Sequence, residues 1–222
     1  MILKGIQKSS FIDYPGKVST VLFTAGCNFR CPYCHNGHLV RNEGEVITEK
    51  EVFSLLTKRK GIIDAVVISG GEPTLYGEEL INFIEEIKKL NYLVKLDTNG
   101  TSPLVVEKLI KRGLIDYIAM DIKAPLSEYS KAVKTKIEVA SIQESISLIK
   151  DSNIPYEFRT TVAKELLTKE DILRIIEEIS PCEKYYLQNF KDGENILEGK
   201  GKFSPVDFLE ELSSEFSFVE VR

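Results

Sequence analysis

The residues with the clearest chemical potential are three cysteines, Cys27, Cys31 and Cys34, which have the spacing Cys-x3-Cys-x2-Cys. Thiolates are soft ligands, and several of them on one short loop favour an iron–sulfur cluster or zinc. Three thiolates leave one coordination position without a local cysteine. In a four-iron cluster, one iron would therefore be free to bind another group.

The main alternative is a structural zinc site, in which His35, His38 or Cys182 supplies the fourth ligand. Zinc sites more often combine two Cys-x2-Cys pairs, or a cysteine pair with a histidine pair, so the observed spacing favours iron. A ferredoxin would use four cysteines in a different spacing. Cys182 lies near the end of a predicted helix, where we expect a partly buried free thiol and not a fourth ligand.

The second chemical signal is the run Gly70, Gly71, Glu72 and Pro73, which directly follows a β-branched segment. Glycines let a ligand approach the backbone, whose N–H groups are then available to it. Glu72 could accept hydrogen bonds from an ammonium or hydroxyl group. Taken alone, the same run is also typical of a simple turn from a strand to a loop.

Short apolar segments alternate along the chain with longer amphipathic ones. The apolar segments predict six strands, each buried on both faces of a parallel sheet, at residues 18–24, 65–69, 93–97, 117–121, 156–162 and 184–188. The amphipathic segments predict helices at residues 48–59, 78–90, 103–111, 139–150, 168–179 and 207–214. A further strand at residues 3–7 is expected to pair with the first of the six across the turn at residues 13–17.

This alternation implies right-handed crossovers and an α/β fold with a parallel sheet. Six strands are fewer than the eight of a complete barrel, so we expect an open, partial (β/α)6 barrel with a short N-terminal strand and a C-terminal helix. A flat, doubly wound sheet is the alternative. In both folds ligands bind at the carboxyl ends of the strands, where both motifs lie. We expect one domain over residues 1–222, with its core at about residues 17–190.

Composition narrows the class of protein. The 222 residues include 29 Lys and Arg against 34 Asp and Glu, a formal charge of −5, which argues against a general nucleic-acid binder. No apolar run approaches the ~20 residues that span a bilayer, and the charged N-terminus is unlike a secretory signal. Four cysteines are too few for a disulfide scaffold. The sequence therefore predicts a cytoplasmic globular protein with neither a membrane nor a nucleic acid as partner.

The cysteine motif and the Gly-Gly-Glu-Pro run, in this order and spacing, resemble the paired signatures of the radical S-adenosylmethionine (SAM) superfamily. The resemblance covers about residues 4–190 and implies a TIM-like partial barrel. The stretch at residues 11–17, followed by residues 27–36, is similar to the activating proteins of the anaerobic ribonucleoside-triphosphate reductase. These proteins belong to the wider group of glycyl-radical-enzyme activases.

The resemblance also implies which residues bind cofactors. Cys27, Cys31 and Cys34 match the cysteines that hold a [4Fe-4S] cluster, and SAM would chelate the open iron. Tyr33 matches an aromatic position near the adenine, and Arg159 a basic position that faces the SAM carboxylate. The complete set assigned to SAM is Tyr33, His35, Gly70, Gly71, Glu72, Pro73, Asp97, Thr98, Asn99, Asp121, Lys123, Arg159 and Gln188, of which Asp97 and Asp121 are also candidates for a monovalent-cation site.

The physical setting of three of these residues agrees with that assignment. Asp97, Asp121 and Arg159 lie in predicted strands that are otherwise apolar. A charge in a buried strand is costly unless it is paired or bound to a ligand. SAM carries an ammonium, a carboxylate and a sulfonium, so it could satisfy charges of both signs. The alternative is an internal ion pair that stabilises the mouth of the barrel.

The activity that the resemblance implies is reductive cleavage of SAM. A flavodoxin or ferredoxin would supply the electron, and the 5′-deoxyadenosyl radical would remove hydrogen from a glycine of a partner glycyl-radical enzyme. No catalytic acid or base is predicted, because the cofactors carry the chemistry. One alternative is a radical SAM enzyme that acts on a small molecule or nucleotide, for which we expect a closed, polar pocket beyond the cluster. The others are a zinc-binding module without catalysis and a plain electron carrier.

Overall fold

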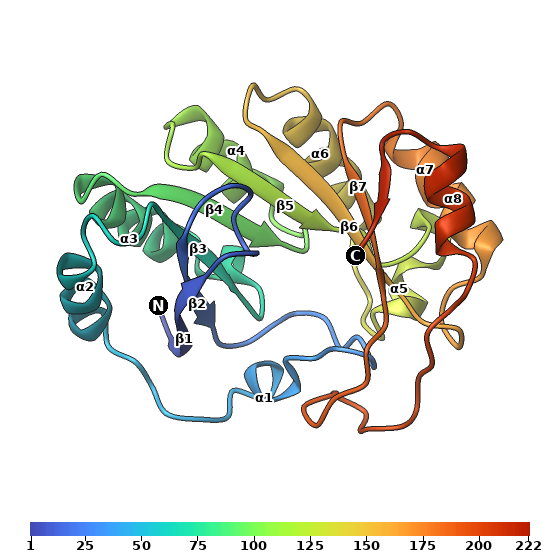
Figure 1. Ribbon diagram of the computed structural model, residues 1–222, viewed down its shortest axis with the longest axis horizontal. Coiled ribbons are helices and arrows are strands. Elements are labelled where there is room, and N and C mark those ends of the chain that lie inside the picture. The colour runs from blue at the N-terminus through green and yellow to red at the C-terminus, as the bar shows by residue number, and fades with distance from the viewer.

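A computed structural model describes all residues from 1 to 222, and its central feature is one eight-stranded sheet (Figure 1). The strands lie in chain order, with β1 antiparallel to β2 and every other neighbouring pair parallel. Their bounds are β1 (Leu3–Ser10), β2 (Ser19–Thr24), β3 (Ala65–Gly70), β4 (Leu93–Thr98), β5 (Tyr117–Asp121), β6 (Tyr156–Val162), β7 (Tyr185–Asn189) and β8 (Val219–Val221).

Helices connect the parallel strands; the longer ones lie along the outer side of the curved sheet, and the short α1 lies away from it, across its open side (Figure 1). They are α1 (Gly37–Val40), α2 (Glu49–Lys58), α3 (Glu78–Lys89), α4 (Pro103–Lys111), α5 (Tyr129–Ala132), α6 (Val139–Lys150), α7 (Lys169–Ile179) and α8 (Leu209–Glu215), with 3-10 helices η1 (Pro73–Tyr76) and η2 (Leu126–Glu128). Sequential strand order with helices on one side is the topology of an open (β/α)6 barrel. The predicted partial barrel is therefore confirmed, and the doubly wound alternative is wrong.

The six predicted parallel strands and the N-terminal strand are all present, and the structure adds β8, which pairs with β7. Three residues are too few for a hydrophobic period, so the sequence did not indicate β8. Thr48 with Glu51, and Thr168 with Asp171, form reciprocal capping boxes at the starts of α2 and α7.

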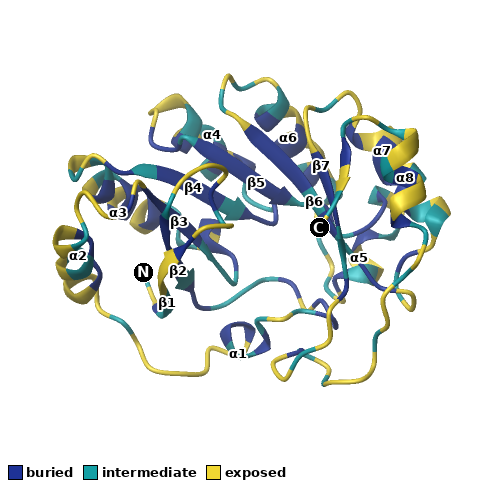
Figure 2. Cartoon of the chain, in the orientation of Figure 1, coloured by how far each residue is buried: buried dark blue, intermediate teal, exposed yellow.

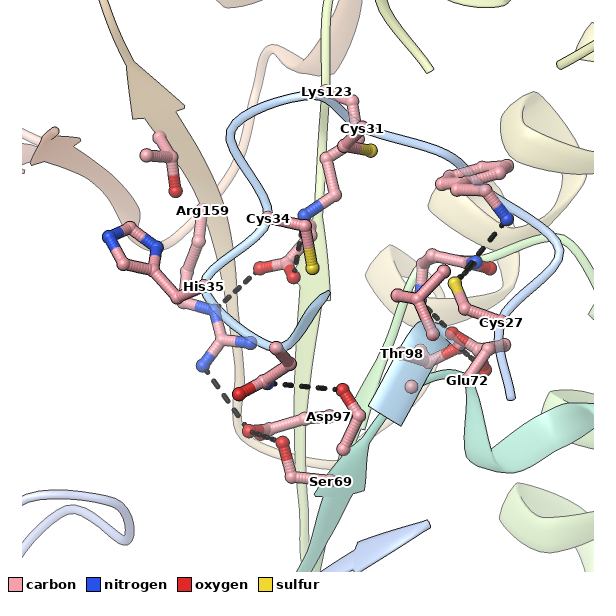
Figure 3. A pocket seen from close by; sticks show the side chains of 18 of the residues that line it. Cys27, Cys31, Cys34, His35, Ser69, Glu72, Asp97, Thr98, Lys123 and Arg159 are labelled. Carbon is pink, nitrogen blue, oxygen red and sulfur yellow. Dashed lines mark hydrogen bonds and ion pairs between the residues drawn. The ribbon is translucent and has the colours of Figure 1, made fainter. Parts of the chain in front are cut away.

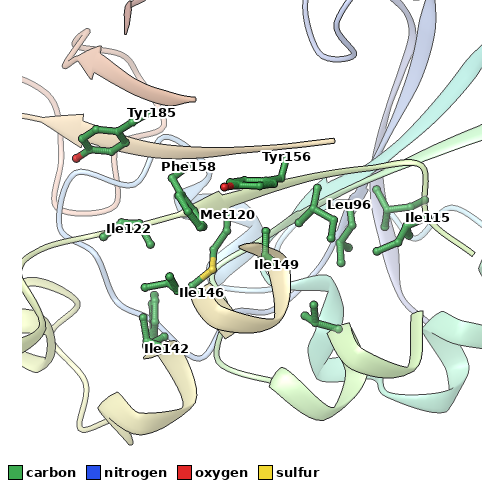
Figure 4. Packing of buried hydrophobic residues seen from close by; sticks show 14 of the residues in the cluster. Leu96, Ile115, Met120, Ile122, Ile142, Ile146, Ile149, Tyr156, Phe158 and Tyr185 are labelled. Atoms are coloured by element: carbon green, nitrogen blue, oxygen red, sulfur yellow. The ribbon is translucent and has the colours of Figure 1, made fainter. Parts of the chain in front are cut away.

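Most of the hydrophobic core is one cluster formed by side chains of the strands and of the helices that cover them, and the strands are mostly buried (Figure 2). Register places Met120 of β5 beside Phe158 of β6, and both belong to the cluster that includes Ile142, Ile146 and Ile149 of α6 (Figure 4). Side chains alternate between the two faces along a strand, so the residues next to Met120 and Phe158 on these strands point toward the inner face of the sheet.

The inner face differs from the expected apolar surface. Its apolar part is small and lies at the amino ends of the strands, where Val21, Val67 and Tyr117 cluster together with Tyr14. The inner face of β4, β5 and β6 carries the charged residues Lys95, Asp97, Asp121, Glu157 and Arg159, of which Asp97 and Asp121 lie at the carboxyl ends. The predicted strands β4 to β6 are largely buried on both faces, as expected, but their inner face is charged where an apolar surface was expected. None of the helices is both long and apolar enough to cross a bilayer.

Candidate cofactor site

A cavity of about 270 Å³ opens at the carboxyl ends of the strands, between the sheet and the loop that follows β2 (Figure 3). Every residue that the sequence assigned to the cofactors lines this cavity, except Pro73, which begins η1. The lining consists of Cys27, Phe29, Cys31, Tyr33, Cys34, His35, Asn36, Val40, Ser69, Gly70, Gly71, Glu72, Asp97, Thr98, Asn99, Asp121, Lys123, Arg159, Thr161 and Gln188.

The three cysteines lie on a segment without regular structure, residues 25–36, here called the cysteine loop. Gly26 turns the chain away from β2 with a φ of 78°, a value that favours glycine. Two other segments hold the loop from outside. The Arg30 nitrogen donates to the Val133 carbonyl at 2.9 Å, and the Leu197 nitrogen donates to the Cys34 carbonyl at 3.0 Å. The positions of the cysteines thus depend on contacts with parts of the chain far away in sequence.

The thiols are buried and close enough to influence one another. Burial raises the pKa of Cys27 to about 11 and the pKa of Cys31 to about 12, and it also raises the pKa of Cys34. Neighbouring thiolates add to this effect at Cys27 and Cys31. Bound metal cations would replace the thiol protons and relieve the repulsion between thiolates. The donor set therefore fits a metal centre.

The arrangement of the donors is compatible with a four-iron cluster. Zinc requires all of its thiolates at about 2.3 Å from one point. No three side chains of His, Cys, Asp or Glu converge in this way. In a four-iron cluster each thiolate binds a different iron, so the three sulfurs can be spread over the wall of the cavity, as Cys27, Cys31 and Cys34 are (Figure 3).

The two glycines of the Gly-Gly-Glu-Pro run are required by the packing of the chain. A β-carbon at Gly71 would clash with the Gly26 carbonyl oxygen, and one at Gly70 would clash with the backbone of Thr24. The Gly71 nitrogen donates to the Thr24 carbonyl and the Glu72 nitrogen donates to the Gly26 carbonyl, both at 2.9 Å. The glycines therefore let the Gly-Gly-Glu-Pro turn lie directly against the start of the cysteine loop.

Glu72 is buried, and its carboxylate is already occupied by donors from the protein. One oxygen accepts hydrogen bonds from the Thr74 nitrogen at 3.0 Å, the Thr74 hydroxyl at 2.5 Å and the Thr98 hydroxyl at 2.7 Å. The other accepts from the Asn99 nitrogen at 2.6 Å. Glu72 thus ties the turn after β3 to the end of β4. This structural role was not foreseen from the sequence.

The inner face presents a connected set of charges of both signs (Figure 3). Asp121 accepts from Arg159 at 2.8 Å and from Lys123 at 2.9 Å. Arg159 also approaches Asp97 at 3.5 Å, and the Ser69 hydroxyl donates to Asp97 at 3.0 Å. Burial would raise the pKa of Asp121, but the two cations outweigh burial and hold the pKa well below its usual value. The carboxylate is therefore ionised at neutral pH.

Part of this charged set was missed in the sequence. Lys95 and Glu157 are buried behind the lining, 3.6 Å apart, and Glu157 also lies 3.8 Å from Arg159 and 3.4 Å from Arg222. The Tyr117 hydroxyl donates to Glu157 at 3.0 Å. A charged residue within an apolar strand was the signal that singled out Asp97, and the same signal would have found Lys95 and Glu157.

The remaining assigned residues have varied settings. Tyr33 is buried, and its hydroxyl has no hydrogen-bond partner in the protein. The His35 ring lies 2.6 Å from the Lys191 carbonyl oxygen and packs near Phe190. The Asn99 side chain bonds the Asn28 side chain at 2.9 Å. An unpartnered buried hydroxyl is costly, so Tyr33 has unused capacity for a ligand.

Some lining residues were not predicted, namely Phe29, Asn36, Val40, Ser69 and Thr161. They carry no metal-binding or strongly charged group, so nothing in the sequence distinguished them.

Cys182 lies outside the cavity, just after the end of α7. It is a partly buried free thiol, and burial raises its pKa to about 11. That part of the prediction is confirmed.

A second cavity of about 690 Å³ continues from the first inside the barrel. The two share His35, Arg159, Thr161 and Gln188. The wall of the second cavity is almost entirely polar and is completed by Ile12, Asp13, Lys95, Asn189, Lys191 and Arg222. The second cavity is open to solvent, since Ile12 is 84% exposed, and it forms a groove with mainly polar lining residues beside the first cavity.

Comparison with known proteins identifies the family. The chain belongs to the radical SAM superfamily, whose family model matches residues 21–179. It is a radical SAM enzyme, and membership of the superfamily implies a [4Fe-4S] cluster and SAM as cofactors. The crystal structure of a radical SAM methyltransferase from Sphaerobacter thermophilus superposes with a TM-score of 0.68 at 14% identity, over 96% of this chain and 68% of the other. This likeness concerns the fold.

Three related proteins differ in what their names describe. A Methanocaldococcus jannaschii protein with the provisional name glycyl-radical enzyme activating enzyme is 39% identical over 86% of this chain and 80% of its own length. A pyruvate formate-lyase-activating enzyme of Clostridium pasteurianum is 32% identical over 54% of this chain and 52% of its own length. A 7-carboxy-7-deazaguanine synthase of Koribacter versatilis is 23% identical over 88% of this chain and 82% of its own length.

Proposed function

We propose that Cys27, Cys31 and Cys34 hold the [4Fe-4S] cluster and that SAM binds beside it in the first cavity. The observation that carries this proposal is the meeting of three buried thiols and the charged set around Asp121 and Arg159 in one cavity. When bound, the two cofactors together supply reductive cleavage of the sulfonium and a 5′-deoxyadenosyl radical. The protein supplies binding, orientation and exclusion of water.

Each part of the cavity suits one part of SAM. Lys123 and Arg159 offer cationic groups to the SAM carboxylate, while Asp97 and Asp121 offer anionic groups to its ammonium. The unpartnered Tyr33 hydroxyl offers a hydrogen bond, and its ring offers a surface to the adenine. The other proposed SAM contacts are His35, Gly70, Gly71, Glu72, Thr98, Asn99 and Gln188, all in the lining, and Pro73 next to them. Asp97 and Asp121 are also the proposed monovalent-cation ligands.

We also propose that the substrate is a glycine of a partner enzyme, so that this chain activates a glycyl-radical enzyme. The provisional name of the Methanocaldococcus relative supports this proposal. The stretch at residues 11–17, together with the cysteine loop, makes an anaerobic ribonucleoside-triphosphate reductase the first partner to test. Flavodoxin or ferredoxin is the proposed electron donor, and the whole chain acts as one radical SAM domain.

The test uses reconstituted protein under anaerobic conditions. We expect wild-type protein with SAM and dithionite to form 5′-deoxyadenosine, and Cys31→Ala to form none. Addition of an anaerobic ribonucleoside-triphosphate reductase should then produce a glycyl radical, seen by electron paramagnetic resonance. Formation of 5′-deoxyadenosine without a radical on that reductase would reject this partner. Stoichiometric zinc in place of iron, with no product, would support the zinc-binding alternative.

One alternative substrate class has an observation in its favour. The second cavity has a polar lining and adjoins the first, as expected of an enzyme that acts on a small molecule or nucleotide, but it is open to solvent and not the closed pocket expected of that class. The similarity to the 7-carboxy-7-deazaguanine synthase of Koribacter versatilis supports the same alternative. If 5′-deoxyadenosine forms with small polar metabolites and no candidate glycyl-radical enzyme acquires a radical, this alternative replaces activation.

A further inference from the structure

The cysteine loop is covered from outside by two segments, and the electron for the proposed chemistry must enter through or beside one of them. One is residues 129–137, which begin with α5. The Phe29 ring packs against the Tyr129 ring with 6.1 Å between centroids, and the Arg30 nitrogen donates to the Val133 carbonyl. Asn28 of the loop and Lys136 of this segment also line the same small surface cavity.

The other cover is the β7–α8 loop, residues 190–208. Its Leu197 and Glu198 nitrogens donate to the Cys34 and Pro32 carbonyls at 3.0 and 3.1 Å. The loop passes so close that a β-carbon at Gly37 would lie 2.7 Å from the Asn195 carbonyl oxygen. Both covers thus contact the backbone that carries the cysteines.

The two covers differ in charge. The β7–α8 loop pairs its own charges, with Lys200 2.5 Å from Glu194 and Lys202 3.9 Å from Glu198. The segment 131–136, here called the basic segment, carries three exposed lysines: Lys131, Lys134 and Lys136. Only Lys131 has an ion-pair partner, Glu128, whose carboxylate lies 3.4 Å from the lysine nitrogen. Both side chains are exposed, so the pair neutralises Lys131 only weakly.

Arg30 extends this positive surface onto the cysteine loop. Its side chain is exposed and donates to the Cys27 and Phe29 carbonyls at 2.6 and 2.7 Å. Arg30 and the three lysines outweigh the two acidic residues that flank the basic segment, Glu128 and Glu138, and leave a net positive surface beside the cysteine loop, on a chain whose formal charge is −5. Cationic surfaces on an acidic protein attract acidic partners and orient them.

We infer that Arg30 and the basic segment form the docking surface for an acidic electron-carrier protein, such as a flavodoxin or ferredoxin. This inference rests on the proposed function, because it requires a cluster at the three cysteines. In the step concerned, the reduced flavin of a flavodoxin passes from hydroquinone to semiquinone as it gives up one electron, and the cluster gains that electron. Docking here brings the carrier close to the thiols, since Arg30 lies on the cysteine loop and the basic segment accepts a hydrogen bond from that loop at Val133.

The test reverses the charge of the basic segment. The variant K131E/K134E/K136E leaves Arg30 unchanged, because Arg30 also bonds the backbone of the cysteine loop. Its matched control is K50E/K58E/K60E, which changes three exposed lysines on and just after α2. The variant K131Q/K134Q/K136Q removes the charge with less perturbation, and circular dichroism checks that each variant folds.

Two readouts separate the inference from the proposed function. The first is the dissociation constant for an acidic flavodoxin and an acidic ferredoxin, measured by calorimetry between 20 and 300 mM salt. We expect salt-weakened binding to the wild type and to the control, and a dissociation constant raised by about tenfold or more in the reversed variant. The second is 5′-deoxyadenosine formation driven by dithionite or by the reduced carrier. We expect the variant to keep the dithionite rate and to lose most of the carrier-driven rate.

The outcomes are distinct. If neither carrier binds the wild type, or if the reversed variant binds and accepts electrons as well as the control, the docking surface lies elsewhere and the inference is overturned. If wild-type protein with a loaded cluster forms no 5′-deoxyadenosine even with dithionite, the proposed function fails, whatever the binding result.

Discussion

Glu72 gives the sharpest test of how the site is built. Its buried carboxylate receives four hydrogen bonds from Thr74, Thr98 and Asn99. In the variant Glu72→Ala the hydroxyls of Thr74 and Thr98 can turn toward other acceptors. The backbone N–H groups of Thr74 and Asn99 cannot, and both residues are buried. The variant therefore leaves two buried donors without an acceptor.

A buried donor left unsatisfied costs about 1–3 kcal/mol. Two such donors lower the free energy of unfolding by about 4 kcal/mol. For a chain of this size, each kcal/mol changes Tm by about 2–4 °C, so the expected fall is roughly 8–16 °C. The measurement is urea and thermal unfolding of the protein without iron or SAM. The control is Glu165→Ala, an exposed carboxylate that accepts one backbone bond from Ser204, for which we expect a loss below about 1 kcal/mol.

The opposite result would refute this reasoning. If Glu72→Ala without cofactors is within about 1 kcal/mol of the wild type, the four bonds do not stabilise the fold. If the same variant also binds SAM more weakly, then Glu72 serves the ligand alone. Loss of stability in the cofactor-free protein is the outcome that only a structural role produces.

Three further predictions concern packing and charge. Gly71→Ala should lower the free energy of unfolding by about 2 kcal/mol or more in urea titrations, because the new β-carbon meets a backbone oxygen, whereas Gly193→Ala meets no atom and should be neutral. In the wild type, the stability from ionised Asp121 is present above its unfolded pKa of about 3.9 and is lost as pH falls below that value. Arg159→Met should remove part of this stability at pH 7, because Lys123 remains, and the unfolding curves of the two proteins should approach each other as pH falls below about 4 toward the folded pKa of Asp121. Gly37→Ala should loosen the β7–α8 loop and speed hydrogen exchange of the amides that bond the cysteine loop, and unchanged exchange would contradict the contact.

Much of the fold could be predicted because its signals are local. Alternating apolar and amphipathic segments are enough to locate six strands and the helices between them. β8 has three residues and pairs only because the chain returns to β7, so no local pattern indicates it. The short helices α1 and α5 have four residues each and depend in the same way on tertiary contacts.

The candidate site was predictable where chemistry is visible in the residue type. Cysteines at fixed spacing and charges within strands, such as Asp121 and Arg159, stand out in the sequence. The structural role of Glu72 could not be predicted from the sequence, because its hydrogen-bond donors lie on two different segments and only the fold brings them together. The cover provided by the β7–α8 loop is also non-local, since its backbone groups bond the cysteine loop from about 160 residues away.

The most direct test of the central claim measures iron and product on the same anaerobic preparations. Wild-type protein and Cys182→Ala should each bind four irons per chain and convert SAM to 5′-deoxyadenosine when reduced with dithionite. Cys27→Ala, Cys31→Ala and Cys34→Ala should lose the cluster and form no product. Equal product from a Cys31→Ala preparation, or no product from a fully loaded wild type, would contradict the claim that these three thiols hold the cluster that cleaves SAM.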